Sequence, residues 1–156
     1  MSVYSSLISG LSICAAGRGC VSHLQVGCRQ MVRMGKPKFL RVCHINARSF
    51  LADSCILDLE ILCANHNIGV LCISETWLNS SRVRHNDLRV ILSGFQAPVR
   101  FDRPDGQTGG GVAIYVRRGL SAIPVNLPVN GVEVVCVELC VSSRKKMYVI
   151  TVSRPL

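Results

Sequence analysis

Apolar and polar residues begin to alternate regularly at residue 39, where the chain predicts a strand, a helix and a second strand. Residues 39–46 (FLRVCHIN) alternate apolar with polar or small side chains, as in a strand with one buried face. Residues 55–66 place apolar side chains at helical spacing. Residues 70–74 (VLCIS) form a continuous apolar run, which is typical of a strand buried on both faces. The order predicts a β-α-β unit with parallel strands.

Both ends of the expected helix carry sequence signals. Asp53 or Ser54 is the predicted N-cap, because a short polar side chain there accepts a hydrogen bond from a free N–H group of the first turn. Gly69 is the predicted stop, because glycine readily adopts the left-handed conformation that ends many helices.

The remainder of the chain predicts an antiparallel meander. Residues 112–118 (VAIYVRR), 131–141 (GVEVVCVELCV) and 147–153 (MYVITVS) are rich in β-branched side chains and predict strands. Residues 142–146 predict a hairpin turn, and residues 88–95 a short strand or turn. The whole order predicts an α/β sandwich with a mixed sheet. A dinucleotide-binding fold is disfavoured, because the first strand-to-helix turn lacks the G-x-G-x-x-G pattern.

Composition indicates one folded domain preceded by an irregular extension. The chain has 156 residues, of which 49% are hydrophobic and 17% charged, so it is expected to bury a core. No charge-free window reaches the length of a membrane-spanning helix, and no membrane association is expected. Residues 1–38 show no periodicity and predict a poorly ordered extension, with a signal or transit peptide as alternatives. The domain proper is predicted at residues 39–156.

The charge is positive and unevenly spread. Lysine and arginine number 18 against 9 acidic residues, and the net charge of +9 favours a polyanionic partner such as DNA. Residues 1–38 hold five of the bases and no acid. The extension therefore predicts sequence-blind contacts with phosphates.

Nine cysteines are many for this length, but their spacing does not indicate crosslinks. Their number is odd and C-x-x-C does not occur, which disfavours a disulfide framework and a zinc site. Six lie inside apolar runs and are predicted to be reduced core thiols: Cys43, Cys55, Cys63, Cys72, Cys136 and Cys140. Reduced thiols favour an intracellular location, the nucleus included.

Two polar residues end the strands of the β-α-β unit and are the candidates for metal chemistry. Asn46 closes the first strand and Glu75 follows the second, so both are expected at the sheet edge where open α/β sheets bind ligands. An amide oxygen beside a carboxylate suits Mg²⁺, which fills its remaining positions with water and phosphate. The alternative interpretation is that Asn46 caps a loop and Glu75 begins a turn.

The segment before residue 112 holds further candidates. Arg100, Asp102 and Arg103 predict either an ion-paired loop at the same edge or a solvated hairpin. The glycines at 109–111 lack the Lys-Ser/Thr ending of a P-loop and lead into a strand, so they predict a close backbone approach rather than a phosphate cradle. Trp77, two residues after Glu75, is predicted to be a packing residue.

Several of these segments together resemble a known family. The strings RVCHINARSF, VLCISETWL, SGFQAPVRFDRPDGQTGGGVAIYVRRGL, VEVVCVELCV and YVITVSRP occur in this order after residue 38. They are similar to the first half of an endonuclease/exonuclease/phosphatase domain. The subtype they resemble is the apurinic-endonuclease-like module of LINE-type (non-LTR) retrotransposon polyproteins, which is associated with a reverse transcriptase.

The resemblance implies a four-layer α/β sandwich of the deoxyribonuclease-I type, a hydrolase that nicks DNA with Mg²⁺. The family's strand-end asparagine maps onto Asn46 and its metal-binding glutamate onto Glu75, which implies catalytic and metal-binding roles for both. Its Arg-x-Asp-Arg segment maps onto Arg100, Asp102 and Arg103, for which nucleic-acid contacts are implied.

The chain also departs from that family. Ser153 stands where similar proteins have the tyrosine of a Tyr-x-Pro-Pro motif, and their later Asp-x-Asn, Asp and Ser-Asp-His motifs do not occur. The expectation is therefore a truncated sandwich that is inactive alone and that self-associates through uncovered strand faces such as residues 132–141. A non-catalytic nucleic-acid-binding module and a relic without a selected role are the alternative interpretations.

Overall fold

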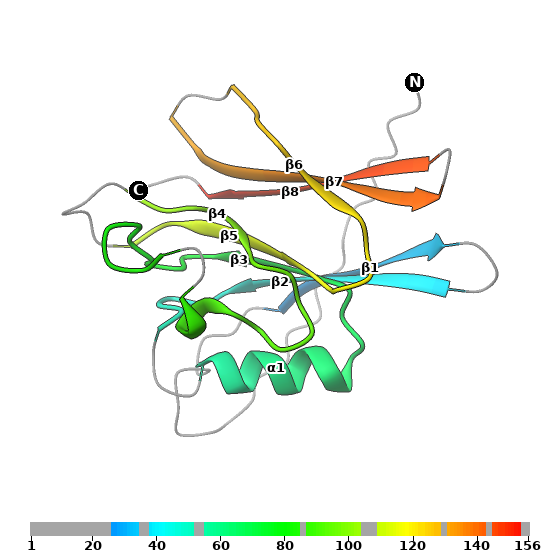
Figure 1. Cartoon of the computed structure of the whole chain (residues 1–156), viewed down its shortest axis with the longest axis horizontal. Coiled ribbons are helices and arrows are strands. Elements are labelled where there is room, and N and C mark those ends of the chain that lie inside the picture. The colour runs from blue at the N-terminus through cyan, green and yellow to red at the C-terminus, as the bar shows by residue number, and fades with distance from the viewer. Residues whose placement is uncertain are drawn as a thin grey trace.

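The computed structural model describes residues 26–34, 38–51, 55–84, 87–103, 109–128, 131–142 and 145–153, which form mainly two β-sheets (Figure 1). The larger sheet has the order β1-β2-β3-β5-β4, with strands Val26–Met34 (β1), Lys38–Asn46 (β2), Val70–Ser74 (β3), Val99–Phe101 (β4) and Val112–Val116 (β5). The smaller sheet has the order β6-β7-β8, with strands Ala122–Val125, Glu133–Ser142 and Lys145–Ser153. The described helices are α1 (Cys55–Asn65) and the 3-10 helix Leu88–Val90.

The predicted β-α-β unit is confirmed. Strands β2 and β3 are parallel and joined through α1, and the other strand pairs of both sheets are antiparallel. The larger sheet is therefore mixed, as the sequence predicts. None of the described helices has the length and apolarity needed to cross a membrane.

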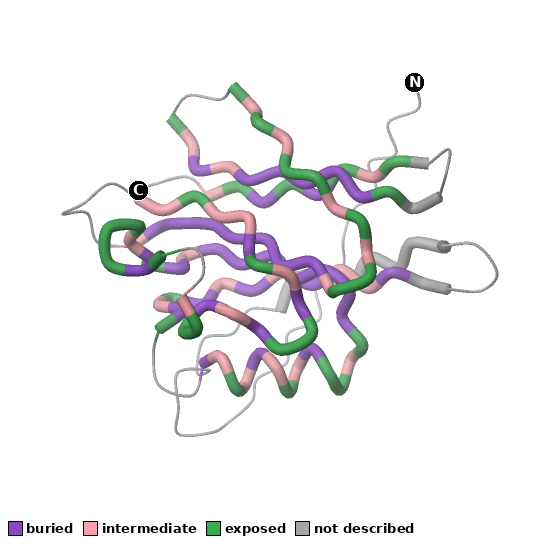
Figure 2. Tube along the Cα trace, in the orientation of Figure 1, coloured by how far each residue is buried: buried purple, intermediate pink, exposed green. Residues whose placement is uncertain are grey.

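Two apolar cores separate three layers. Helix α1 covers one face of the larger sheet, and the smaller sheet packs on the other face (Figure 1). Leu59 and Tyr115 belong to the core under the helix, whereas Ile114 and Val137 belong to the core between the sheets. Because both faces of β3 and β5 are covered, every residue of these strands is buried (Figure 2).

The extension predicted at residues 1–38 contains a strand. Residues 26–34 form β1, which pairs with the edge of β2, while residues 1–25 lie outside the described residues. The pairing shifts register between Gly27 and Gln30. Strand β1 lies at the edge of the sheet and forms backbone hydrogen bonds with one neighbour, β2. These bonds do not require a regular alternation of apolar and polar residues, so the hydrophobic pattern of the sequence did not predict β1.

Helix α1 ends differently from the prediction. Its last residue is Asn65, and Asn67 takes the left-handed conformation at φ 48° that was expected of Gly69. The N–H groups of Asn67 and the next residue bond to carbonyls of the last turn at 3.2 and 3.0 Å, as in a Schellman motif. Gly69 instead allows close packing, because a Cβ there would overlap Leu40. The predicted N-cap at 53–54 lies outside the described residues.

The cysteines largely follow the prediction. All six are reduced thiols, and five are buried: Cys43, Cys55, Cys63, Cys72 and Cys136. Cys140 is exposed, so the prediction of a core thiol is wrong at this position.

The smaller sheet buries one face against the larger sheet, and apolar side chains of its edge strands are exposed on the other. Val135, Val137 and Leu139 of β7 are buried against the larger sheet, so this part of residues 132–141 is covered. Apolar side chains of β6 and β8 are more than half exposed on the outer face: Ile123, Tyr148, Ile150 and Val152. The exposed apolar surface therefore belongs mainly to the two edge strands.

Candidate metal and nucleic-acid site

The loops after β2 and β3 and the loop before β5 lie side by side at one edge of the larger sheet. Ser49 N–H donates to the carbonyl of Glu75 at 3.0 Å, and Trp77 N–H donates to the carbonyl of Gly110 at 2.9 Å. The sheet register pairs Asn46 with the last residue of β3. Asn46 and Glu75 therefore end adjacent parallel strands, as the sequence predicts.

The carboxylate of Glu75 is held by donors from three segments. Its Oε2 accepts the N–H of Gly110 at 2.8 Å and the indole N–H of Trp77 at 2.9 Å, and its Oε1 accepts a longer bond from the Ser153 hydroxyl at 3.4 Å. Burial raises the pKa of the Glu75 carboxyl, but these donors and the charge of Arg103 outweigh burial and bring the pKa below its usual value. The carboxylate is therefore ionised at neutral pH.

Asn46 contributes an oxygen whose hydrogen bonding is incomplete. Its Oδ1 is buried and has no donor among the described residues. Burying an acceptor without a donor costs about 1–3 kcal/mol, which a cation bound there would offset. Together with the weakly bonded Oε1 of Glu75, this oxygen suits a hard divalent cation such as Mg²⁺.

The site offers few ligands. In the part of the chain that the structure describes, no group of three or more His, Cys, Asp or Glu side chains is placed to hold a metal. Asn46 and Glu75 would therefore supply two positions of an Mg²⁺ shell, and water and phosphate would fill the others.

The glycine loop before β5 binds carboxylates through its backbone. Gly110 N–H donates to Glu75, and Gly111 N–H donates to Oε2 of Glu133 at 2.7 Å. The other carboxylate oxygen of Glu133 accepts the Nε–H of Arg103. The loop thus permits a close approach, as predicted, with its N–H groups directed at side-chain anions of the protein itself.

Glu133 was not among the residues singled out from the sequence. It is the first residue of β7 and only 4% exposed, and it reaches from the smaller sheet to the glycine loop of the larger one. Its one sequence signal is an acidic residue within an apolar strand. This signal does not indicate which residue pairs with Glu133, because Arg103 lies thirty residues earlier in the sequence.

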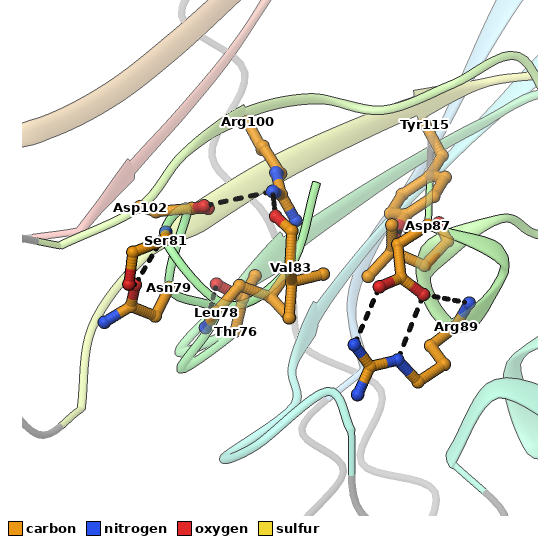
Figure 3. A network of polar contacts seen from close by, with 11 residues as sticks. Thr76, Leu78, Asn79, Ser81, Val83, Asp87, Arg89, Arg100, Asp102 and Tyr115 are labelled. Atoms are coloured by element: carbon orange, nitrogen blue, oxygen red, sulfur yellow. Dashed lines mark hydrogen bonds and ion pairs between the residues drawn. The ribbon is translucent and has the colours of Figure 1, made fainter. Parts of the chain in front are cut away.

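Arg100 and Asp102 form a buried ion pair (Figure 3). Their charged atoms are 3.3 Å apart, and their side chains are 1% and 4% exposed. Arg100 also donates to the carbonyl of Val83, while its Nε and Nη1 have no acceptor among the described residues. The ion-paired interpretation is confirmed and the solvated hairpin is wrong. A phosphate contact by Arg100 would require this pair to open.

Unfavourable backbone conformations gather at the same edge. Four of the five non-glycine residues with positive φ in the described part of the chain follow β2 or β3: Arg48, Ser49, Glu75 and Trp77. Such conformations cost energy and are concentrated at functional sites in proteins. Their position supports a functional interpretation of this edge.

Trp77 is not the packing residue that was predicted. It is 49% exposed, whereas its neighbours Thr76 and Leu78 are 1% and 3% exposed. The backbone directs these neighbours inward, so the indole faces outward beside Glu75. The sequence signal that could have indicated the position of Trp77 beside Glu75 is that the two residues are only two positions apart.

Comparison with known proteins gives no family. No protein-family model matches the chain, and no curated protein sequence is significantly similar to it. The geometry around Asn46 and Glu75 is therefore the main basis for a functional proposal.

Proposed function

We propose that the chain is part of a metal-dependent phosphodiesterase domain of the endonuclease/exonuclease/phosphatase type, and that these 156 residues bind Mg²⁺ and DNA without nicking the DNA. The observation that carries this proposal is the ionised Glu75 carboxylate at the end of β3, together with a buried Asn46 oxygen at the end of the neighbouring strand β2 that has no donor among the described residues. The motif order and the helix-sheet-sheet layering support a partial sandwich of the deoxyribonuclease-I type.

The proposed roles follow from the contacts at this edge. Glu75 would hold the cation, while Gly110 and Trp77 donate to Oε2 and thereby orient the carboxylate. Asn46 adds a neutral oxygen. Mg²⁺, when bound, supplies charge neutralisation at a phosphate and a lowered pKa of a bound water.

The proposed lack of nicking follows from the missing groups. The resemblance places the general base and a histidine in motifs that do not occur in the sequence, and Ser153 stands where similar proteins have a tyrosine. Loss of one electrostatic stabiliser typically lowers kcat about 10²- to 10³-fold. Several such losses would leave no measurable nicking.

Cation binding can be tested on the full chain through its single tryptophan, which contacts Glu75. We expect a saturable change in Trp77 fluorescence at millimolar Mg²⁺, and its loss in Glu75→Gln. Glu60→Gln is the matched control, because Glu60 accepts the N–H of Ser93, an interaction that glutamine can keep. The proposal is wrong if Glu75→Gln responds to Mg²⁺ as the parent does.

Nicking of supercoiled plasmid tests the second half of the proposal. The parent chain with Mg²⁺ is expected to match the Glu75→Gln background. Mg²⁺-dependent nicking by the parent that disappears in Glu75→Gln would show instead that the chain is an active nuclease.

A further inference from the structure

Trp77 presents a large aromatic surface beside the Glu75 carboxylate, and we propose that it stacks on a base of single-stranded DNA bound at this edge. The inference rests on the proposed function and names the form of nucleic acid that the Glu75 site takes. Trp77 is 49% exposed, whereas the adjacent Thr76 and Leu78 are buried. The ring is therefore available to a ligand in solution.

One hydrogen bond holds the backbone of Trp77 and another holds its indole. The backbone N–H of Trp77 donates to the carbonyl of Gly110, and its indole N–H donates to Oε2 of Glu75, both at 2.9 Å. The indole nitrogen is the only polar atom of this side chain, so the exposed surface consists mainly of ring carbons. Because the ring is already ordered before a ligand binds, it loses little conformational entropy when a planar base stacks on it.

The backbone of Trp77 supports a binding role. Its φ of 53° lies in the left-handed region, which is rarely occupied by bulky residues. Half of the side chain nevertheless faces solvent, so packing of the ring offsets only part of the cost. A strained residue that holds an apolar ring in solvent is expected where a ligand later covers that ring.

The surroundings favour nucleic acid as the ligand. Arg48 is exposed and lies in the loop that Ser49 fastens to the carbonyl of Glu75 at 3.0 Å, and the chain carries a net charge of +9. Cations for phosphates and aromatic faces for bases are the two components of single-strand binding sites. Base faces are covered in a duplex but accessible in a single strand, so we expect single-stranded DNA to bind in preference, with little sequence dependence.

Intrinsic fluorescence provides a direct test, because Trp77 is the only tryptophan of the chain. The full chain is titrated with oligo(dT) in EDTA, and then with an abasic oligonucleotide of the same length, which carries the same phosphates without bases. We expect saturable quenching by oligo(dT) and none by the abasic strand. Absence of quenching by oligo(dT), or equal quenching by both strands, would overturn the proposal.

Affinity measurements by fluorescence anisotropy of labelled strands separate stacking from folding. Trp77→Ala is expected to bind oligo(dT) about tenfold more weakly, whereas Trp77→Phe, which keeps an aromatic face, stays within about threefold of the parent. Affinity for the abasic strand should not change in either variant. Tyr148→Ala removes an exposed aromatic ring from β8 and is the control expected to bind as the parent does.

The outcomes distinguish this inference from the function on which it rests. An equal loss of affinity for both strands in Trp77→Ala, or no loss at all, would show that stacking is wrong. If the proposed Mg²⁺ site is wrong, this appears in a separate measurement: the change in Trp77 fluorescence on addition of Mg²⁺ is then the same in Glu75→Gln as in the parent. Because the stacking measurements are made in EDTA, they do not depend on bound cation.

Discussion

Arg103 and Glu133 form an ion pair that joins the two sheets directly behind Gly110. Their side chains are 15% and 5% exposed, and Glu133 also accepts the N–H of Gly111. A Cβ on Gly110 would overlap both the guanidinium of Arg103 and the carboxylate of Glu133. Glycine at this position therefore allows the loop that donates to Glu75 to pack against the pair.

Gly110→Ala is expected to lower the free energy of unfolding by about 2–4 kcal/mol, which urea denaturation can measure. The loss combines the cost of alanine at φ 73° with overlap against the Arg103–Glu133 pair. Gly119→Ala is the control, because φ there is 91° and a Cβ would meet nothing within 4 Å. Its expected cost is about 1–2 kcal/mol. Equal losses in the two variants would contradict a packing role for Gly110.

Glu133→Gln is expected to destabilise the protein by about 3 kcal/mol. The substitution keeps the size of the side chain but removes the negative charge beside the mostly buried Arg103 guanidinium. Glu138→Gln provides a comparison, since the ionic partner of Glu138 is Lys146, whose side chain is 62% exposed. We expect the second variant to melt close to the parent, and a similar melting shift in both would argue against the ion pair as a junction between the sheets.

Arg100→Met is expected to cost about 3 kcal/mol, because it leaves the carboxylate of Asp102 buried without the cation beside it. The double variant Arg100→Met/Asp102→Asn should be more stable than Arg100→Met alone, since no buried charge then remains at the pair. Chemical denaturation of the four members of this cycle measures the coupling. Additive losses would show that the two charges do not interact.

Thiol reactivity should follow burial. Burial raises the pKa of Cys63 to about 12, so this thiol stays protonated at pH 9, whereas Cys140 is exposed. We expect iodoacetamide to modify Cys140 of the native protein well before Cys63. Peptide mapping by mass spectrometry measures both rates, and denaturant should remove the difference. Rapid native labelling of Cys63 would show that the core under α1 opens readily.

Self-association is expected through the outer face of the smaller sheet, where Ile150 and Val152 are 52% and 53% exposed. Exposed apolar strands at a sheet edge favour pairing between molecules. Ile150→Lys should shift the chain toward monomer in sedimentation experiments at increasing concentration. Ile61→Lys, which replaces a 50% exposed residue of α1, should not. A parent chain that stays monomeric at all concentrations would contradict the expectation.

The local pattern of apolar and polar residues was sufficient to predict the strands in which buried positions recur regularly along the sequence. The alternation at residues 39–46 and the apolar run at Val70–Ser74 predicted β2 and β3, because strands covered on one or both faces need those patterns. Parallel pairing through a single crossover then predicted Asn46 and Glu75 at one edge of the sheet, where the structure has them.

Only the tertiary structure decided how that edge is built. The partnership of Arg103 with Glu133, the burial of Arg100 and the exposure of Trp77 all depend on which distant segment packs against each residue. Strand β1 likewise depends on the free edge of β2 rather than on its own periodicity. Periodicity encodes which side of an element is buried, but it does not encode what buries it, because those contacts join residues far apart in the chain.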